Sequence, residues 1–424
     1  MNVRRMRTEN GTLIFRIPPD QVSSPEAAAL LSEAAALLRS GETVVFPTET
    51  VYGLGAVASS PEAVRKIFAA KGRPGDNPLI VHIWEPEQLF AVGTRVPDTG
   101  AVLARHFWPG PLTLVVPVGP DIVPEVTAGL STVGVRLPAH PVALALLRQV
   151  GLPVAAPSAN LSGRPSPTTA EHAVHDLDGR VAAIIDSGPT AVGLESTVLD
   201  ITLFPPTVLR PGGITREELE DLLGMGIAEQ LSAPPGQKPR SPGQKYTHYK
   251  PKAQVRMVQG TAEIRLAENP GPGAVAGTRR VAVPDFAPLA QAVWDRCVRE
   301  RRRSQHPAIL ATEETLPYYW ACGARWESLP PVFTGPLVPA GAGKELEGVW
   351  LFNLGSRADL HQIAAHLYTC LRLLDAVDAT VAFAEQVPAQ GIGAAVMNRL
   401  RRACGGLVWD PLAGSESEAG SPGF

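Results

Sequence analysis

Residues 60–83 read SPEAVRKIFAAKGRPGDNPLIVHI, a stretch that predicts a helix, a short loop and a strand in succession. Ser60 is a favourable N-cap, and Pro61 fits the first turn because its missing N–H is not needed there. Gly72 suits the left-handed residue that commonly ends a helix. We therefore expect a helix at residues 61–71, with the apolar run after the loop forming a strand.

The loop between this helix and strand carries Lys71 and Arg73, with Asn77 close behind. Two cations fixed on a short loop beside an amide side chain suit a polyanion such as a triphosphate. Cations also favour helix C-termini simply because they complement the helix dipole. From these residues alone, both interpretations stay open.

Four other polar motifs stand at the edges of apolar segments. They are Pro47-Thr48-Glu49-Thr50-Val51-Tyr52-Gly53, Ser158-Ala159-Asn160, Glu195-Ser196-Thr197 and Arg210-Pro211-Gly212-Gly213. A strand that runs into a polar loop with glycine is where α/β proteins place ligands. Each motif taken singly fits ordinary turn chemistry equally well, because Ser, Asn, Pro and Gly are common loop residues.

Taken together and in this order, the motifs resemble the threonylcarbamoyl-AMP synthases of the YrdC-like superfamily, in their longer two-domain, Sua-type branch. The resemblance is strong over residues 25–213. It continues through the linker motif SPGQKYTHYKP at 241–251, and resumes in NLGSR at 353–357 and AVMNRL at 395–400. The joint occurrence of the motifs carries the resemblance, since no single motif is decisive.

The order of predicted elements indicates an α/β fold in two domains. Several strands follow one another without a helix, so the first sheet should be mixed. The resemblance implies an α/β (α+β) protein: a YrdC-type twisted mixed sheet with helices, joined by a linker to a smaller Rossmann-like, doubly wound domain. We place the YrdC-like catalytic domain at 24–223, the linker at 224–251, the C-terminal domain at 252–411 and a disordered tail at 412–424.

Periodicity and capping signals give the expected elements in more detail. Helices are expected at 24–39, 61–71, 141–150, 170–177, 215–223, 289–302, 358–376 and 393–403. Strands are expected at 43–46, 79–83, 112–118, 132–137, 182–186, 196–201, 207–210, from 281, and at 308–311, 349–354 and 380–384.

Composition narrows the classes of function. The 424 residues carry a net charge of −3, which argues against a protein that binds polyanions through its bulk field. The four cysteines lack the spacing of a zinc ribbon or a disulfide framework, so we expect free thiols in a reducing cytoplasm. No apolar run is long enough for a transmembrane helix, so no membrane partner is expected.

The resemblance implies a specific reaction, in which L-threonine, bicarbonate (or CO2) and ATP give threonylcarbamoyl-AMP and pyrophosphate. A tRNA-modifying transferase complex would receive this adenylate and modify the adenosine next to the anticodon, and transient tRNA contact is a further expectation. Positioning and electrostatics should dominate such chemistry. Mg2+ is expected with ATP, and no metal site of the protein's own is expected.

The resemblance also implies roles for individual residues. Lys71 and Arg73 are the expected catalytic residues; ATP is expected to contact Arg73, Asn77, Thr132, Asn160, Thr168, Arg210 and the linker residue Tyr249; threonine is expected to contact Thr50, His82, Arg136, Ser158 and Ser196. A guanidinium matches the geometry of a carboxylate, which makes Arg136 the natural partner of the threonine carboxylate.

Several alternatives remain at this stage. Arg136 could form a surface ion pair on a strand, and His82 could be a satisfied, half-buried histidine. Lys66 fits a solvated helix face, and so does the basic block 299–303, although that block could also contact RNA. The segment 313–331, rich in Tyr and Trp, matches nothing in the family.

Two other functions are alternatives to the synthase. The first is a non-catalytic RNA-binding protein, which would show tRNA affinity that falls steeply with salt and no ATP binding. The second is another carbamoyl-adenylate chemistry, as in hydrogenase-maturation carbamoyltransferases, whose acylphosphatase and zinc-finger segments have no counterpart in this sequence. For the second domain and linker, the hypothesis is that they close over the nucleotide and protect the adenylate from water.

Overall fold

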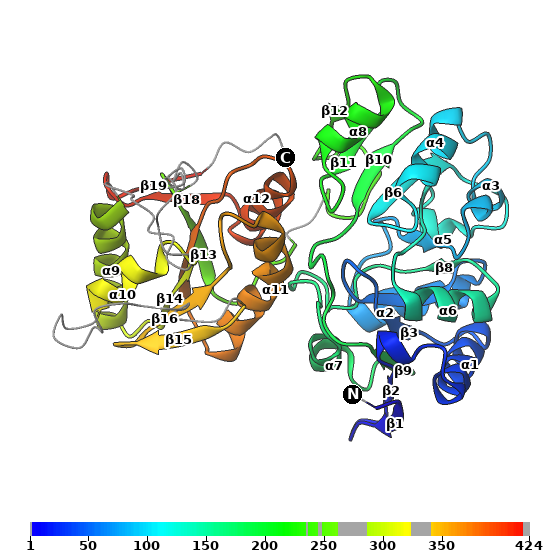
Figure 1. Ribbon diagram of the computed structural model, residues 1–424, viewed down its shortest axis with the longest axis horizontal. Coiled ribbons are helices and arrows are strands. Elements are labelled where there is room, and N and C mark those ends of the chain that lie inside the picture. The colour runs from blue at the N-terminus through cyan, green and yellow to red at the C-terminus, as the bar shows by residue number, and fades with distance from the viewer. Residues whose placement is uncertain (1, 235, 245–247, 262–285, 324–340, 419–424) are drawn as a thin grey trace, which may run out of the picture. The chain divides into compact units, whose positions relative to one another are not determined.

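The computed structural model describes residues 2–234, 236–244, 248–261, 286–323 and 341–418. The chain forms two compact units, the first ending at residue 246 and the second beginning at residue 247 (Figure 1). Each unit has its own sheet and its own hydrophobic core.

The described residues of the first unit contain a twelve-stranded sheet in the order β1-β2-β9-β3-β4-β8-β5-β7-β6-β10-β11-β12. Its strands are β1 (Arg4–Arg7), β2 (Leu13–Arg16), β3 (Val44–Phe46), β4 (Gly53–Val57), β5 (Ile80–His82), β6 (Leu112–Pro117), β7 (Thr132–Arg136), β8 (Val154–Ala155), β9 (Ala183–Asp186), β10 (Thr197–Asp200), β11 (Thr207–Arg210) and β12 (Ala228–Glu229). The sheet contains parallel pairs, such as β5 with β7, and antiparallel pairs, such as β6 with β7. The predicted mixed sheet is confirmed.

The helices of the first unit are α1 (Pro25–Arg39), α2 (Pro61–Lys71), α3 (Leu89–Val92), α4 (Asp98–Phe107), α5 (Pro124–Thr127), α6 (Pro141–Val150), α7 (Ala170–Leu177) and α8 (Arg216–Leu223), with 3-10 turns at Pro19–Gln21 and Pro86–Gln88. The start and end predicted for α2 are confirmed. The Ser60 side chain accepts from the Ala63 N–H, and Gly72 adopts the left-handed conformation with φ 60°. The capping residues thus allowed both ends of this helix to be predicted from the sequence.

The two faces of this sheet are covered differently. One face packs against residues of α2, α3, α4, α5, α7 and α8 in a single large core. On the opposite face, α1 and α6 pack over the part of the sheet that contains β2, β9 and β3. Further along that opposite face, the described residues include an apolar cluster of Ile80, Val115, Val198 and Leu209, and none of these four is a helical residue. This leaves room on the same face for polar side chains.

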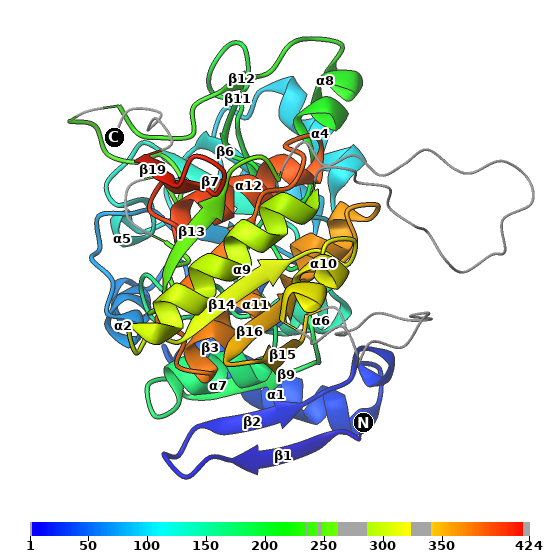
Figure 2. The ribbon, with the colours of Figure 1, turned by 90° about the vertical axis from the view of Figure 1, so that its left-hand side faces the viewer.

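The first unit begins earlier than the predicted catalytic domain at residue 24. β2 pairs with β9 in parallel, and β1 pairs with β2 at the edge of the sheet (Figure 2). The Arg16 Nε lies 2.7 Å from a carboxylate oxygen of Asp186, which ties β2 to β9. The run Leu13-Ile14-Phe15 is too short to be identified as a strand until its partner, far along the chain, is known.

The predicted linker at 224–251 belongs in part to the first unit. β12 adds to the sheet by pairing in parallel with β11. Further on, the Arg240 Nη2 lies 2.9 Å from the buried carboxylate of Asp200, and Lys238 donates to the Ala128 carbonyl at 2.8 Å. These contacts attach this part of the predicted linker to the first unit.

The loop after β11 depends on a close approach of two backbones at Gly212. A Cβ atom on this residue would lie 2.3 Å from the Glu195 carbonyl oxygen and 2.3 Å from the Thr197 nitrogen. Only glycine fits such a position without moving one of the two segments. Gly212 therefore fixes the loop after Arg210 against the backbone of Ser196.

The described residues of the second unit form a seven-stranded sheet in the order β15-β16-β14-β17-β13-β18-β19. The elements are β13 (Gln254–Val258), α9 (Phe286–Arg302), β14 (Pro307–Ala311), α10 (Leu316–Gly323), β15 (Gly343–Leu346), β16 (Val349–Asn353), α11 (Leu360–Ala376), β17 (Val381–Glu385), α12 (Ile392–Ala403), β18 (Leu407–Asp410) and β19 (Ser415–Glu418). The five central strands are parallel, and the two edge strands are antiparallel to their neighbours.

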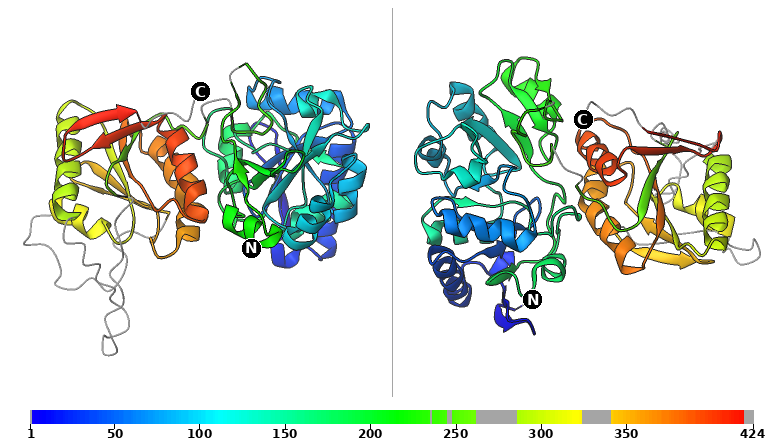
Figure 3. Two further views of the ribbon diagram at one scale, coloured as in Figure 1. Left: turned by 90° about the horizontal axis from the view of Figure 1, so that it is seen from above. Right: turned by 180° about the vertical axis from the view of Figure 1, so that it is seen from behind.

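Helices cover both faces of the second sheet. α9 and α10 lie on one face, and α11 and α12 on the other (Figure 3). The predicted doubly wound α/β domain is confirmed. The predicted disordered tail from residue 412 is wrong in part, because β19 lies within it and pairs with β18. The strand expected from residue 281 lies outside the described residues, whereas α10 accounts for part of the unplaced segment 313–331.

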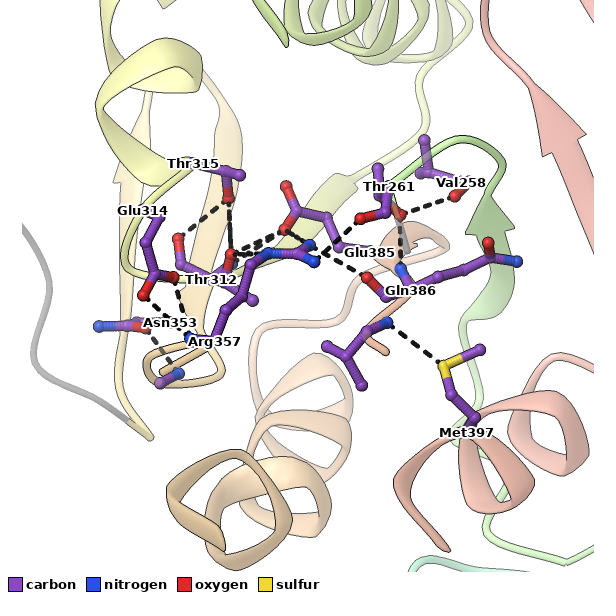
Figure 4. Close-up of polar contacts among 12 residues, drawn as sticks. Val258, Thr261, Thr312, Glu314, Thr315, Asn353, Arg357, Glu385, Gln386 and Met397 are labelled. Carbon is purple, nitrogen blue, oxygen red and sulfur yellow. Dashed lines mark hydrogen bonds and ion pairs between the residues drawn. The ribbon is translucent and has the colours of Figure 1, made fainter. Parts of the chain in front are cut away.

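Arg357 fills the carboxyl edge of the parallel strands in the second unit (Figure 4). Its Nε donates to the Thr312 hydroxyl at 2.9 Å, its Nη1 to the Thr261 carbonyl at 2.9 Å, and its Nη2 to Glu385 Oε2 at 2.9 Å. Both members of the Arg357–Glu385 ion pair are buried. This edge is where doubly wound sheets usually bind ligands. Here the protein's own guanidinium bonds to groups that follow or end three different strands.

Replacement of Arg357 by Met should destabilise the second unit by about 3–5 kcal/mol, because it leaves the buried Glu385 carboxylate without its counter-charge. Hydrogen exchange of the β14 and β17 amides measures this loss. The control is Arg303→Met, since the Arg303 side chain is 70% exposed and lies 3.8 Å from its partner Glu300. Unchanged protection of β14 in Arg357→Met would contradict the assignment of Arg357 as a structural residue.

Gly212→Ala should lower the stability of the first unit by about 1–3 kcal/mol, because the added methyl group meets backbone that cannot easily move. Urea unfolding measures the effect. Gly226→Ala serves as the matched control, since a Cβ atom there meets nothing within 4 Å. Equal midpoints for the two variants would show that the Ser196 backbone moves aside freely.

Candidate active site

Lys71 stands at the centre of the first group of predicted site residues. It is the last residue of α2 and is buried. Its ammonium donates to the backbone carbonyls of Ser158 and Asn160, the latter at 2.6 Å. These two hydrogen bonds fix the Lys71 side chain on the Ser158–Asn160 loop, and the chain leaves the helix through the left-handed Gly72.

The Ser158–Asn160 loop is held in place from several sides. Ser158 forms an isolated β-bridge with Gly53, at the start of β4. The Asn160 amide donates to the carbonyls of Leu161 and Arg164 at 2.7 and 3.0 Å. The loop that the sequence singled out for its polar residues is therefore rigid, and it lies beside the predicted cationic loop.

Arg73 and Asn77 lie close to each other. The Arg73 Nη2 donates to the Asn77 backbone carbonyl at 3.1 Å. The Asn77 side chain is fully buried, and within the part of the chain that is described neither of its amide atoms has a hydrogen-bond partner. A buried amide in this state is uncommon in proteins and often marks a group reserved for a ligand.

The second group centres on Arg136, the last residue of β7. Its register partner across the parallel pair is His82, the last residue of β5. Its Nη1 donates to the Thr50 hydroxyl at 2.8 Å, and its Nε donates to the Gly110 carbonyl at 3.3 Å. The three residues predicted to bind threonine on these elements, Thr50, His82 and Arg136, are thus brought together.

Glu49 was missed as a site residue by the sequence analysis. Its Oε1 lies 2.7 Å from Arg136 Nη2, and both side chains are buried. Arg136 is therefore part of a buried ion pair and not of the surface pair considered from the sequence. The only signal was the position of Glu49 beside Thr50 in a polar motif, because its partner lies 87 positions later, counted from the numbers 49 and 136.

His82 is buried and neutral. Burial, and next the positive charge of Arg136, lower the pKa of His82 to about 3. The Phe46 ring meets its imidazole edge-on at 5.7 Å, and its Nδ1 has no hydrogen-bond partner among the residues described. The sequence suggested a half-buried histidine, whereas the structure buries His82 and leaves one ring nitrogen, Nδ1, without a partner among the described residues.

Arg210 and Ser196 form the third group. The Arg210 Nε and Nη2 both donate to the Ser196 carbonyl, at 3.1 and 3.0 Å, and Nη2 also contacts the Ser196 hydroxyl at 3.1 Å. Thr113, a residue that the sequence analysis missed, lies 2.8 Å from that hydroxyl. Thr113 precedes Leu114, the register partner of Val135, so it faces Arg136 and links this group to the second.

Thr132 and Thr168 are both buried. Thr132 begins β7 and lies on the same face as Arg136, because alternate residues of a strand share a face. The Thr168 hydroxyl lies 3.3 Å from His172 Nδ1, and its carbonyl accepts from the Thr190 N–H at 2.9 Å. The Thr168 side chain therefore sits at the start of α7, on the loop that follows Asn160.

Tyr249 belongs to the second unit, where it is buried. Its ring stacks on Tyr368 at 5.1 Å, and the Arg399 guanidinium lies 5.6 Å from the ring centroid. Tyr249 also has a positive φ of 66°, which is uncommon for an aromatic residue. Its predicted role above the nucleotide stays a prediction.

The described residues offer no support for a metal site or a membrane span. No group of three or more His, Cys, Asp or Glu side chains there is arranged to hold a metal ion. No helix among them is both long and apolar enough to cross a membrane. All four cysteines are free, and burial raises the pKa of the Cys322 thiol to about 11 and that of Cys370 to about 12.

Comparison with known proteins identifies the family. A family model described as "Telomere recombination" matches residues 36–212, and one described as "Threonylcarbamoyl-AMP synthase, C-terminal domain" matches residues 214–405. The threonylcarbamoyl-AMP synthase of Bacillus subtilis is 44% identical over 89% of this chain and 94% of its own length. That of Pyrococcus abyssi is 39% identical over 88% of this chain and 93% of its own length.

A solved structure agrees with these relatives. The crystal structure of Pyrococcus abyssi Sua5 complexed with L-threonine superposes with a TM-score of 0.74 at 36% identity, and the match covers 93% of this chain and 98% of that one. Sequence and fold thus lead to the same assignment. This chain belongs to the two-domain branch of the threonylcarbamoyl-AMP synthase family.

Proposed function

We propose that this protein is an L-threonylcarbamoyladenylate synthase, which converts L-threonine, bicarbonate (or CO2) and ATP to threonylcarbamoyl-AMP and pyrophosphate. The observation that carries the proposal is the presence of two kinds of site in the first unit. One is a buried Arg–Glu pair beside a neutral histidine, and the other is Lys71, which is held on the Ser158–Asn160 loop, together with Arg73. The first suits a small zwitterion, and the second suits a polyphosphate.

Threonine would bind at the group around Arg136. The guanidinium would take the carboxylate, since its planar N–H groups match carboxylate oxygens. The Thr50 hydroxyl and the neutral His82 ring would lie beside the substrate, and Ser196 would complete this end. Ser158 would face the substrate from the loop that Lys71 holds in place.

ATP would bind along the other groups. Lys71 and Arg73 would neutralise its phosphates, and Asn77, with its unpartnered amide, would contact them. Further contacts are proposed for Thr132, Asn160, Thr168, Arg210 and Tyr249. Mg2+ would enter as the MgATP substrate, because this ion is usually held by phosphate oxygens and water.

The chemistry needs positioning and charge stabilisation more than a protein nucleophile. A carbamate oxygen on the threonine nitrogen would form a bond to the α-phosphorus as the bond from that phosphorus to the bridging oxygen breaks. The electron pair would leave with pyrophosphate, whose growing charge Lys71 and Arg73 would stabilise. Their fixed positions avoid reorganisation at the moment of reaction.

The cellular role follows from this product. We propose that the adenylate passes to a tRNA-modifying transferase complex that places the threonylcarbamoyl group next to the anticodon. Transient tRNA contact and a cytoplasmic location are part of the same proposal, and the free thiols support a reducing compartment. The closing of the second domain and linker over the nucleotide also remains a proposal.

Pyrophosphate release tests the proposed function. The protein is supplied with MgATP, bicarbonate and each amino acid in turn. Release that requires both threonine and bicarbonate supports the synthase. Release that does not require threonine, or tRNA binding that falls steeply with salt in a protein that releases no pyrophosphate, would favour the other functions considered.

Lys71→Met should reduce threonine-dependent pyrophosphate release by about 100-fold or more, because it removes a fixed cation from the developing charge. Arg73→Ala should have an effect in the same direction. Lys66→Ala is the matched control: Lys66 lies on the same helix, but it is exposed and pairs only with the exposed Glu42 among the described contacts. Comparable activities of the Lys71 and Lys66 variants would remove Lys71 from the mechanism.

Threonine affinity should not depend on the protonation of His82 between about pH 8 and about pH 5. Because the pKa of His82 is lowered to about 3, the ring stays neutral between about pH 8 and about pH 5 in the folded protein. It becomes protonated only near pH 3. Calorimetric titration across this range measures the affinity. A loss of affinity with a midpoint near the ordinary histidine pKa, absent in His82→Gln, would contradict the neutral assignment.

A further inference from the structure

Glu49 and Arg136 form an ion pair that is incomplete as a hydrogen-bonded unit. The closest contact between the two groups, Oε1 to Nη2, is 2.7 Å. Among the described residues, the two Glu49 carboxylate oxygens and Arg136 Nη2 have no hydrogen-bond partner. Both residues are more than nine-tenths buried, at 8% and 4% exposure.

Such a pair is costly if its only role is structural. A buried carboxylate and guanidinium must recover the hydration that they lose, and hydrogen bonds normally supply most of this recovery. The Arg136 Nε and Nη1 already have partners in Gly110 and Thr50. The hydrogen-bonding groups of the pair that remain without a partner among the described residues are therefore Nη2 and the Glu49 carboxylate, which lie next to each other.

The unused capacity includes both signs of charge. Nη2 can donate to an anionic oxygen, and the two Glu49 oxygens can accept from a cationic N–H group. The unpartnered Nδ1 of His82 lies on the strand next to Arg136 and adds a neutral polar group. An α-amino acid carries a carboxylate and an ammonium group two bonds apart, so it presents both complements at once.

We propose that Glu49 is a substrate-binding residue that accepts hydrogen bonds from the α-ammonium group of threonine while Arg136 Nη2 donates to its carboxylate. This inference rests on the proposed function, since it assigns a further residue to the same site. It makes Glu49 responsible for the preference for an amino acid over a hydroxy acid of the same shape. No proton transfer to Glu49 is required.

A purely structural role for Glu49 predicts a different behaviour. If Glu49 only orients Arg136, its loss weakens every ligand that has a carboxylate. If Glu49 accepts the ammonium group, its loss weakens only ligands that have this group. L-Threonine and (R)-3-hydroxybutyrate distinguish the two roles, because the second keeps the carboxylate and the hydroxyl but lacks the amine.

The experiment measures the Kd of L-threonine by calorimetry, and that of (R)-3-hydroxybutyrate by competition with L-threonine, in the full-length protein. In Glu49→Gln, threonine affinity should fall about 10- to 100-fold, the range for loss of a hydrogen bond to a charged group. The affinity for hydroxybutyrate should stay within about twofold, as expected if no contact with this ligand is lost. Asp186→Asn is the control, since Asp186 is also a buried carboxylate paired with an arginine, and threonine affinity should not change in it.

Equal losses for both ligands would overturn the proposal, and so would unchanged threonine affinity. If hydroxybutyrate fails to displace threonine from the wild type, the threonine affinities of Glu49→Gln and Glu49→Asp decide alone, and wild-type affinity in both overturns the proposal. Glu49→Asp also serves if the glutamine variant does not fold; it keeps the charge and should lose less affinity. A wild type that binds threonine through Glu49 but releases no pyrophosphate would refute the proposed function and leave this inference intact.

Discussion

The burial of Arg136 is the constraint on which the first unit's site depends. A guanidinium cannot be buried without partners, and its partners here come from separate segments: Thr50 and Glu49 before β4, and Gly110 before β6. One side chain therefore joins β7 to two loops. The polar groups along this face occur where the apolar cluster is smallest and includes no helical residue. The contacts that allow Arg136 to be buried thus also leave charged groups available to a ligand.

The second unit also buries an arginine, Arg357, but gives it a complete set of hydrogen-bond acceptors. Each nitrogen of Arg357 donates to a protein group, and the guanidinium occupies the edge where doubly wound sheets usually take a ligand. Arg136 keeps one nitrogen without a hydrogen bond among the described residues, next to a carboxylate in the same state. The two buried Arg–Glu pairs thus differ at the arginine, because every nitrogen of Arg357 donates a hydrogen bond and Arg136 Nη2, among the described residues, does not. This difference, and not burial or charge alone, separates a structural pair from a candidate binding site.

Much of this arrangement could be predicted from the sequence, because its signals are local. The cap at Ser60 and the left-handed Gly72 define α2, and alternation and apolar runs define the central strands. The motif order indicated the family, and two of its motifs meet where Lys71 donates to the Asn160 carbonyl. Glu49 and Thr113 could not be predicted, because their roles depend on partners from distant strands. The same reason explains β1, β2, β12 and β19, whose strand signals are too short without a known neighbour.

The most direct test of this account is the mass of the nucleotide product formed from ATP, L-threonine and [13C]bicarbonate. The account predicts a product in which AMP is joined to threonine through one 13C-labelled carbonyl group, formed together with pyrophosphate. That result would require threonine, the carbon donor and the nucleotide to meet in one site. A threonine–AMP product without the label would show direct activation of the amino acid. Pyrophosphate release without either product would contradict the assignment of the first unit as a threonylcarbamoyl-AMP synthase site.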